Sequence, residues 1–301
     1  MAEAARGLST PKGSAGGLIH RHRWLTPYLL LTPGLAWLAL FFCVPLGFLV
    51  HQSLETQNPI DFTSSFSWAW HNYSDALTGY HSQLVRSFEY AAIATAIALL
   101  VSYPLVYWIA FRGGRWKNLL LLMIIAPFFV TYLIRTLAWE TILSDQGIVV
   151  RILRDVHILA PDGRLLATSV AVVAGITYNF LPFMALPLYV ALEQIDPRLI
   201  EAAQDLYASK PKAFLRVTLP LSAPGLVAGT LLTFIPAAGD FINAQLLGTP
   251  GQYMIGNVIQ SKFLELTDYP AAASLSLLLM AIIIVMIGIY VRILGTEKLT
   301  G

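Results

Sequence analysis

Long apolar runs separated by short polar segments dominate the chain. Five runs without a charged side chain are each long enough to cross about 30 Å of hydrocarbon, which takes about 20 helical residues. A sixth run is apolar except for Arg135 near its end. The predicted transmembrane helices cover residues 28–50, 90–111, 118–140, 165–192, 217–240 and 269–291. The pattern therefore predicts an all-α polytopic membrane protein with six transmembrane helices and little chain left for a soluble domain.

Composition agrees with this class and narrows it. The 301 residues are 56% hydrophobic and 12% charged, against about 25% charged in soluble domains. The net charge is only +2 and no basic run occurs, so we expect no nucleic acid as partner and the lipid bilayer as surroundings. Cys43 is the only cysteine and falls in the first predicted span, which excludes a disulfide or a thiolate metal cluster within one chain.

The positions of the positive charges predict the orientation. With the N-terminus inside, thirteen Lys and Arg residues fall in cytoplasmic segments and five in outer segments. The bias predicts cytoplasmic tails at 1–27 and 293–301, a transmembrane domain at 28–292, and a cytoplasmic loop at 193–219. The first span is long enough to remain as an uncleaved anchor.

Prolines interrupt several predicted spans. Pro33 and Pro45 are expected to kink the first span, and Pro182 and Pro187 to distort the fourth. Backbone carbonyls freed in the fourth span could line a water-filled path, or the kink could simply pack against neighbouring helices. Both interpretations remain open. The aromatic cluster 66–73 also has two interpretations: a belt at the membrane interface, or a surface that contacts an external partner.

The loop at 193–219 carries signals for two short helices. Asp196 is a good N-cap and Pro197 a good first-turn residue. Ser209 and Pro211 can begin a second helix four residues after Asp205. Two such helices would form a charged knob outside the bilayer, although an ordinary polar loop would show some of the same features.

The same loop resembles the EAA loop of permease subunits of bacterial ATP-binding-cassette (ABC) importers. Its pattern of E-A-A, G-A, an aromatic residue, L-P and P-G matches this sequence, except that Tyr207 replaces the family's glycine. The resemblance implies an importer-permease (MetI-like) bundle in the bacterial inner membrane, with this loop coupled to an ATPase. The residues that it assigns to ATPase coupling are Glu201, Ala202, Ala203, Asp205, Tyr207, Ala208, Phe214, Pro220, Pro224 and Gly225.

Tyr207 is the one departure from the loop's pattern. A glycine between two short helices permits a turn with φ above zero, whereas a tyrosine there costs about 1 kcal/mol or requires a different turn. The sequence is therefore compatible with either turn.

Other motifs resemble the polyamine (spermidine/putrescine) permeases of this family. They are L-x-R-T-x-x-W at 133–139, Phe183-Met184, F-x-P-x-x-G-D at 234–240 and L-L-G at 246–248. The resemblance implies transport by alternating access. It also implies three partners: an ABC ATPase dimer, a second homologous permease that is a different chain, and an extracytoplasmic substrate-binding protein.

The chain shows no catalytic or nucleotide-binding motif. It lacks the G-x-x-x-x-G-K-[ST] loop, so ATP and Mg²⁺ are expected to be used by the partner ATPase, with no cofactor on this chain. The six histidines are scattered rather than spaced as metal ligands. We expect a transport subunit, not an enzyme. The alternatives are an importer for another small solute and an ion-coupled secondary transporter, which would show acids at mid-membrane and an internal repeat.

Ionisable and aromatic residues near the ends of spans three, four and five are candidates for the translocation path: Arg135, Trp139, Glu140, Tyr178 and Asp240. In one interpretation Arg135 pairs with Asp240 or extends to the interface. In the other, Asp240 or Glu140 attracts a cation together with Trp139. Because a free Arg135 would oppose a cationic substrate, the pairing is the expected arrangement. If Asp240 lies on the path, Asp240→Asn should lower uptake of a cation and leave assembly intact.

Overall fold

The computed structural model describes residues 25–58 and 60–294. The predicted tails lie almost wholly outside the described residues, and so do five of the cations in the charge bias: Arg6, Lys12, Arg21, Arg23 and Lys298. The chain divides into two compact units, Met1–His51 and Gln52–Gly301.

The first unit contains one apolar helical segment. Helix α2 (Leu25–Leu38) continues through a π turn, η1 (Ala39–Cys43), into α3 (Val44–Ser53). The π turn ends two residues before Pro45. Proline has no N–H to donate to the carbonyl one turn earlier, and the wider π turn accommodates this missing hydrogen bond. The predicted irregularity at Pro45 therefore takes the form of a π turn within an otherwise helical span.

The second unit is mostly helical, with one short hairpin. Strands β1 (Glu55–Gln57) and β2 (Ser64–Phe66) pair antiparallel, with Thr56 opposite Ser65. Its α-helices are α4 (His71–Gly79), α5 (His81–Arg112), α6 (Lys117–Ile125), α7 (Tyr132–Leu143), α8 (Ile148–Asp155), α9 (Ser169–Glu193), α10 (Pro197–Asp205), α11 (Lys210–Ala213), α12 (Leu219–Leu221), α13 (Ala223–Ala238), α14 (Ile242–Leu247), α15 (Ile255–Gln260) and α16 (Tyr269–Leu294). Shorter turns are the 3₁₀ segments η2 (Gly114–Trp116), η3 (Ala126–Phe129) and η5 (Pro250–Gln252), and the π segments η4 (Phe214–Thr218) and η6 (Ser261–Glu265).

Four described helices are long and apolar enough to cross a membrane, and the number rises to six if each of two bent pairs is one span. The predicted all-α membrane class is confirmed, but spans three and five are bent, by 97° and 65°. In span three, η3 contains Pro127 and is followed by extended backbone at Val130 and Thr131. In span five the bend falls at Ser222, just before α13, whose second residue is Pro224.

Helix α9 runs unbroken through Pro182 and Pro187, so the expected distortion does not divide it. Tight packing against α13 covers this stretch. A Cβ added at Gly225 would lie 2.6 Å from the Pro187 carbonyl oxygen, and one at Gly229 would lie 2.9 Å from that of Met184. Small residues four apart allow such close approach between helices in a membrane. The packing favours the packed interpretation of these prolines over a water-lined one.

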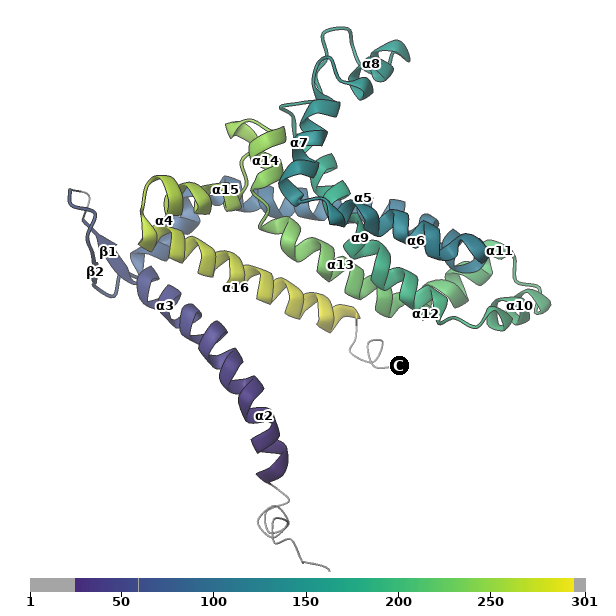
Figure 1. Cartoon of the computed structure of the whole chain (residues 1–301), viewed down its shortest axis with the longest axis horizontal. Helices are drawn as coiled ribbons and strands as arrows, with labels where there is room; N and C mark the ends of the chain where they lie inside the picture. Colours follow the sequence, from purple (N-terminus) through teal and green to yellow (C-terminus); the bar gives the residue numbers. More distant parts are fainter. Residues whose placement is uncertain (1–24, 59, 295–301) are drawn as a thin grey trace, which may run out of the picture. The chain divides into compact units, whose positions relative to one another are not determined.

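Helices α5, α9 and α13 pack against one another and form the core of the second unit. On α5 the fully buried Ala91, Ala94 and Ala98 lie on one face and allow this close approach. Helix α16 packs on α4 and α15. In Figure 1 the short helices α10 and α11 lie at one end of this core, and α4 and α15 lie at the other.

Candidate functional site

Helix α10 begins where the sequence predicts. The Asp196 side chain accepts a hydrogen bond from the backbone N–H of Arg198, over 2.9 Å, and Pro197 occupies the first turn. None of the side chains of α10 is buried, and Glu201 and Asp205 are exposed. The helix therefore presents most of its surface for contact with another molecule, while Ile200 and Ala203 are half-buried.

Tyr207 keeps the turn that a glycine would make. Its φ is +61°, and its side chain is 98% exposed. The neighbouring Leu206 is 80% exposed, so two adjacent large side chains are exposed to solvent at the tip of the loop. Helix α11 begins after Ser209 as predicted, although the Ser209 hydroxyl makes no capping hydrogen bond. The left-handed turn resolves the question left by the sequence.

Phe214 connects the loop to the core. Its ring lies edge-on against Tyr103 and Tyr107 of α5, with centroids 5.4 and 5.8 Å away. The Tyr103 hydroxyl lies 2.7 Å from that of Ser222, at the bend between α12 and α13. A displacement of the loop would therefore reach α5 and α13 directly.

The other end of the loop is held by an ion pair. Lys117 Nζ of α6 lies 2.7 Å from the Glu193 carboxylate at the end of α9, and 5.3 Å from the centre of the Tyr189 ring. Both ends of the segment between α9 and α13 are thus attached to transmembrane helices.

Asp240 lies at the opposite end of α13, and both of its carboxylate oxygens accept hydrogen bonds. Its side chain is only 6% exposed. One carboxylate oxygen accepts from the backbone N–H groups of Ile242 and Asn243, at 3.0 and 3.4 Å. The other accepts from the Tyr132 hydroxyl at 2.9 Å and the Asn243 amide at 2.5 Å. The carboxylate therefore joins the α13–α14 corner to α7 and is closed to a passing solute.

Two asparagines outside the candidate set extend this network. The Asn179 side-chain amide donates to Thr136 and to Asn243, both over 3.2 Å, and so ties α9 to α7 and α14. Neither Asn179 nor Asn243 is among the path candidates expected from the sequence. The available signal was an amide side chain in an apolar run, where an unpaired polar group is costly.

The expected pairing of Arg135 with Asp240 is wrong. Arg135 is 8% exposed, and its guanidinium carbon lies 4.8 Å from the centre of the Phe128 ring and 5.6 Å from that of Tyr132. No ion pair joins it to Asp240, because Tyr132 and Asn243 occupy that carboxylate. Arg135 Nε and Nη1 have no hydrogen-bond partner within the described ranges.

Trp139 and Tyr178 do come together. Their rings pack edge to face, with centroids 5.3 Å apart. Both line a groove of about 690 Å³ between α5 and α9, at the end away from the loop. Glu140 is half-buried and belongs neither to this groove nor to the Asp240 network. The five path candidates therefore do not form one site. Trp139 and Tyr178 line the groove, Arg135 and Asp240 are buried with different partners, and Glu140 belongs to neither group.

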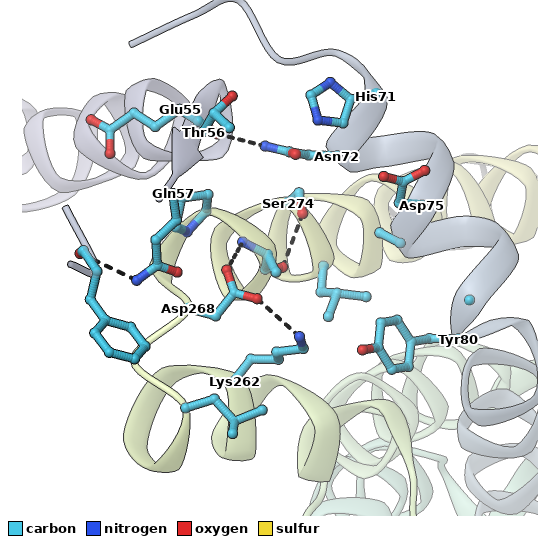
Figure 2. A pocket seen from close by; sticks show the side chains of 17 residues that line it. Glu55, Thr56, Gln57, His71, Asn72, Asp75, Tyr80, Lys262, Asp268 and Ser274 are labelled. Atoms are coloured by element: carbon cyan, nitrogen blue, oxygen red, sulfur yellow. Dashed lines mark hydrogen bonds and ion pairs between the residues drawn. The ribbon is translucent and has the colours of Figure 1, made fainter. Parts of the chain in front are cut away.

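A second cavity, of about 670 Å³, lies among β1, α4, η6 and the start of α16 (Figure 2). In its wall Lys262 Nζ lies 2.9 Å from an Asp268 carboxylate oxygen. Burial lowers the pKa of Lys262, but the hydrogen bond and the charge of Asp268, together with Tyr80, outweigh burial and raise that pKa above its ordinary value. Lys262 therefore stays charged at neutral pH. Gln57 closes another side by donating to the Thr267 carbonyl over 2.9 Å.

The family model described as the binding-protein-dependent transport system inner membrane component matches residues 102–295, more than half of the chain. The chain belongs to this family. It is therefore a multi-pass inner-membrane permease subunit of an ABC importer and not an enzyme. In this family ATP is hydrolysed by a separate subunit.

Curated relatives match over most of the chain. The spermidine/putrescine transport system permease protein PotB of Haemophilus influenzae is 37% identical over 258 residues, which cover 85% of this chain and 90% of that protein. PotB of Escherichia coli K12 is 35% identical over 257 residues, covering 85% and 93%. The E. coli inner membrane ABC transporter permease protein YdcU is 31% identical over 206 residues, covering 64% and 66%.

Solved structures share the fold. A chain of a bacterial ABC transporter involved in the import of the polysaccharide alginate superposes with a TM-score of 0.64 at 18% identity, covering 94% of this chain and 98% of that one. A chain of the MetNI methionine ABC transporter gives a TM-score of 0.55 at 15% identity, covering 73% and 95%. The MetI-like importer-permease fold expected from the sequence is confirmed.

Proposed function

We propose that this permease carries polyamines of the spermidine and putrescine class across the inner membrane. The observation that carries the proposal is the 37% identity to a spermidine/putrescine permease over 85% of the chain, which spans 90% of that relative. The R-T-x-x-W and G-D motifs at Arg135 and Asp240 agree with it. The Asp240 side chain fixes the packing between α7, α13 and α14 rather than meeting the substrate.

ATPase coupling is assigned to the loop around Glu201. Three features support this role. The side chains of α10 are unburied, Leu206 and Tyr207 offer bare apolar surface at its tip, and Phe214 packs on α5. Helix α10 docks in a groove of the ATPase, and closure of the ATPase dimer displaces α5 and α13 as rigid bodies. ATP and Mg²⁺ are bound by the ATPase, and this chain holds no cofactor.

The remaining partners follow from the importer architecture. A second, different permease completes the path, and an extracytoplasmic binding protein delivers the substrate. Both termini lie in the cytoplasm, as the charge bias indicates. Trp68 and Trp70 are 63% and 64% exposed, which fits either a belt at the headgroup level or a contact with the binding protein.

Uptake of labelled spermidine tests the proposal. Cells without their own polyamine importers receive this chain with its transporter partners, as wild type or with Glu201→Ala. We expect energy-dependent uptake by the wild type and a loss of about tenfold in the variant, since a charged contact with the ATPase is worth about 1.5–3 kcal/mol. Glu265→Ala, which removes an exposed carboxylate outside the loop, is the control and should transport normally. An assembled, ATP-hydrolysing complex without polyamine uptake would refute the substrate and keep the importer.

A further inference from the structure

We propose that the groove between α5 and α9, named here the Glu89 groove, binds the polyamine during translocation. The alkyl chain lies along its apolar floor, one ammonium group meets Glu89, and another meets the Trp139–Tyr178 pair. This inference rests on the proposed function and assigns the substrate to a definite set of side chains.

The floor of the groove has the shape of an extended chain. On α5 the lining residues Glu89, Ile93 and Ile97 are four apart and share one face of the helix. They extend over about 12 Å at 1.5 Å per residue. Val173 and Leu181 of α9 line the facing side. A chain of methylene groups would lose water on both sides there, which is favourable by about 0.8 kcal/mol per buried methylene.

Glu89 supplies the charge. Its carboxylate is exposed at one end of the apolar floor and makes no ion pair or hydrogen bond among the residues that the structure describes. Arg86 also lines the groove, but its Nη1 is held by the Tyr253 carbonyl over 2.9 Å and it forms no ion pair with Glu89. An incoming ammonium group would thus find an acceptor without competing with a resident ion pair.

Aromatic rings supply the second recognition element. Trp139 and Tyr178 pack edge to face in the wall of the groove. Tyr90 also lines it, and its hydroxyl donates to that of Ser169 over 2.7 Å, which fixes the ring. Aromatic faces attract ammonium groups by about 0.5–2 kcal/mol, the larger values applying when water is excluded.

The combination selects this ligand class over other occupants. A lipid tail would use the apolar floor and leave Glu89 without a partner in the membrane, which is costly. An anionic solute would be repelled by Glu89. Asp240, the acid that the sequence suggested, is unavailable because both of its oxygens are occupied. A flexible methylene chain that carries ammonium groups matches the carboxylate, the aromatic pair and the apolar floor.

Protection of a cysteine in the groove tests the assignment. In the assembled complex, Cys43→Ser removes the only native cysteine of this chain, and Ile93→Cys places one on the groove floor. A small cationic methanethiosulfonate reagent then labels this chain, a reaction that requires a water-accessible thiolate. With spermidine at four times its dissociation constant, labelling should slow about fivefold. Ser82→Cys, exposed on α5 outside the groove, is the matched control and should react at an unchanged rate.

A second variant tests whether the charge of Glu89, rather than the shape of the groove, is needed to bind spermidine. Glu89→Gln keeps the side-chain size, and we expect it to raise the spermidine concentration needed for protection about tenfold. The inference is overturned if spermidine slows neither cysteine, slows both equally, or protects equally well in Glu89→Gln. It is also overturned if Ile93→Cys never reacts, because another subunit or lipid then covers the groove. Wild-type spermidine uptake with any of these results leaves the proposed function standing, whereas absent uptake refutes that function itself.

Discussion

At the level of single residues, the buried Asp240 holds neighbouring helices together through its hydrogen bonds. Its two oxygens receive four hydrogen bonds from Ile242, Asn243 and Tyr132. The pattern holds the corner between α13 and α14 against α7. A buried acceptor of this kind is costly to remove, because its donors are then left unpaired.

Substitution at Asp240 should therefore change stability rather than transport. In Asp240→Asn an N–H₂ group replaces one acceptor and faces donors, so we expect the unfolding free energy to fall by about 1–3 kcal/mol. Uptake per assembled complex should stay within about twofold of wild type. The readouts are the thermal midpoint of the purified complex and uptake normalised to complex. Tyr132→Phe, which removes one donor, should produce a smaller drop. If Asp240→Asn kept normal stability but lost uptake, Asp240 would instead have a role in the translocation path.

Tyr207 carries backbone strain at the tip of the loop. Its φ of +61° is unfavourable for any residue with a Cβ. Tyr207→Gly should remove about 1 kcal/mol of this strain, so the thermal midpoint should be unchanged or higher. Tyr207→Val, with a branched Cβ, should lower it. Both are read by thermal unfolding, and equal midpoints for the two variants would show that the turn does not persist in solution.

At the scale of elements, the contact of α13 with α9 depends on glycine. Gly225→Ala would place a Cβ 2.6 Å from the Pro187 carbonyl oxygen and force the helices apart. We expect the complex to lose stability by about 1–3 kcal/mol, as overpacked cores do. Gly288→Ala on α16 meets nothing within 4 Å and is the matched control, expected to be neutral or slightly stabilising. Thermal midpoints that move equally in both variants would contradict the close contact.

The elements were predictable to different degrees. The apolar runs and the Asp196-Pro197 start of α10 follow from local patterns, since span length and capping depend on neighbours in sequence. The break at Val130 and Thr131 comes several residues after Pro127, and its angle depends on what α7 packs against. The Asn179–Asn243 bond joins residues 64 positions apart, so no local pattern contains it. The Arg135 environment was mispredicted for the same reason, because Asp240 is occupied by Tyr132 and Asn243.

At the scale of the whole molecule, the loop and the Glu89 groove occupy opposite ends of α5 and α9. Phe214 contacts α5 near one end of that helix, and Glu89 lies near the other. A rigid displacement of α5 would therefore change the groove when the loop moves. This arrangement gives ATP hydrolysis outside the membrane a mechanical connection to a substrate within it.

We propose that this chain forms the membrane path of an ATP-driven polyamine importer. The most direct test is accumulation of labelled spermidine in proteoliposomes that hold the purified complex, with the binding protein supplied on one side and ATP on the other. We expect accumulation against a gradient that requires hydrolysable ATP and falls about tenfold with Glu201→Ala. Accumulation that continues without ATP hydrolysis, or that is indifferent to Glu201→Ala, would contradict it.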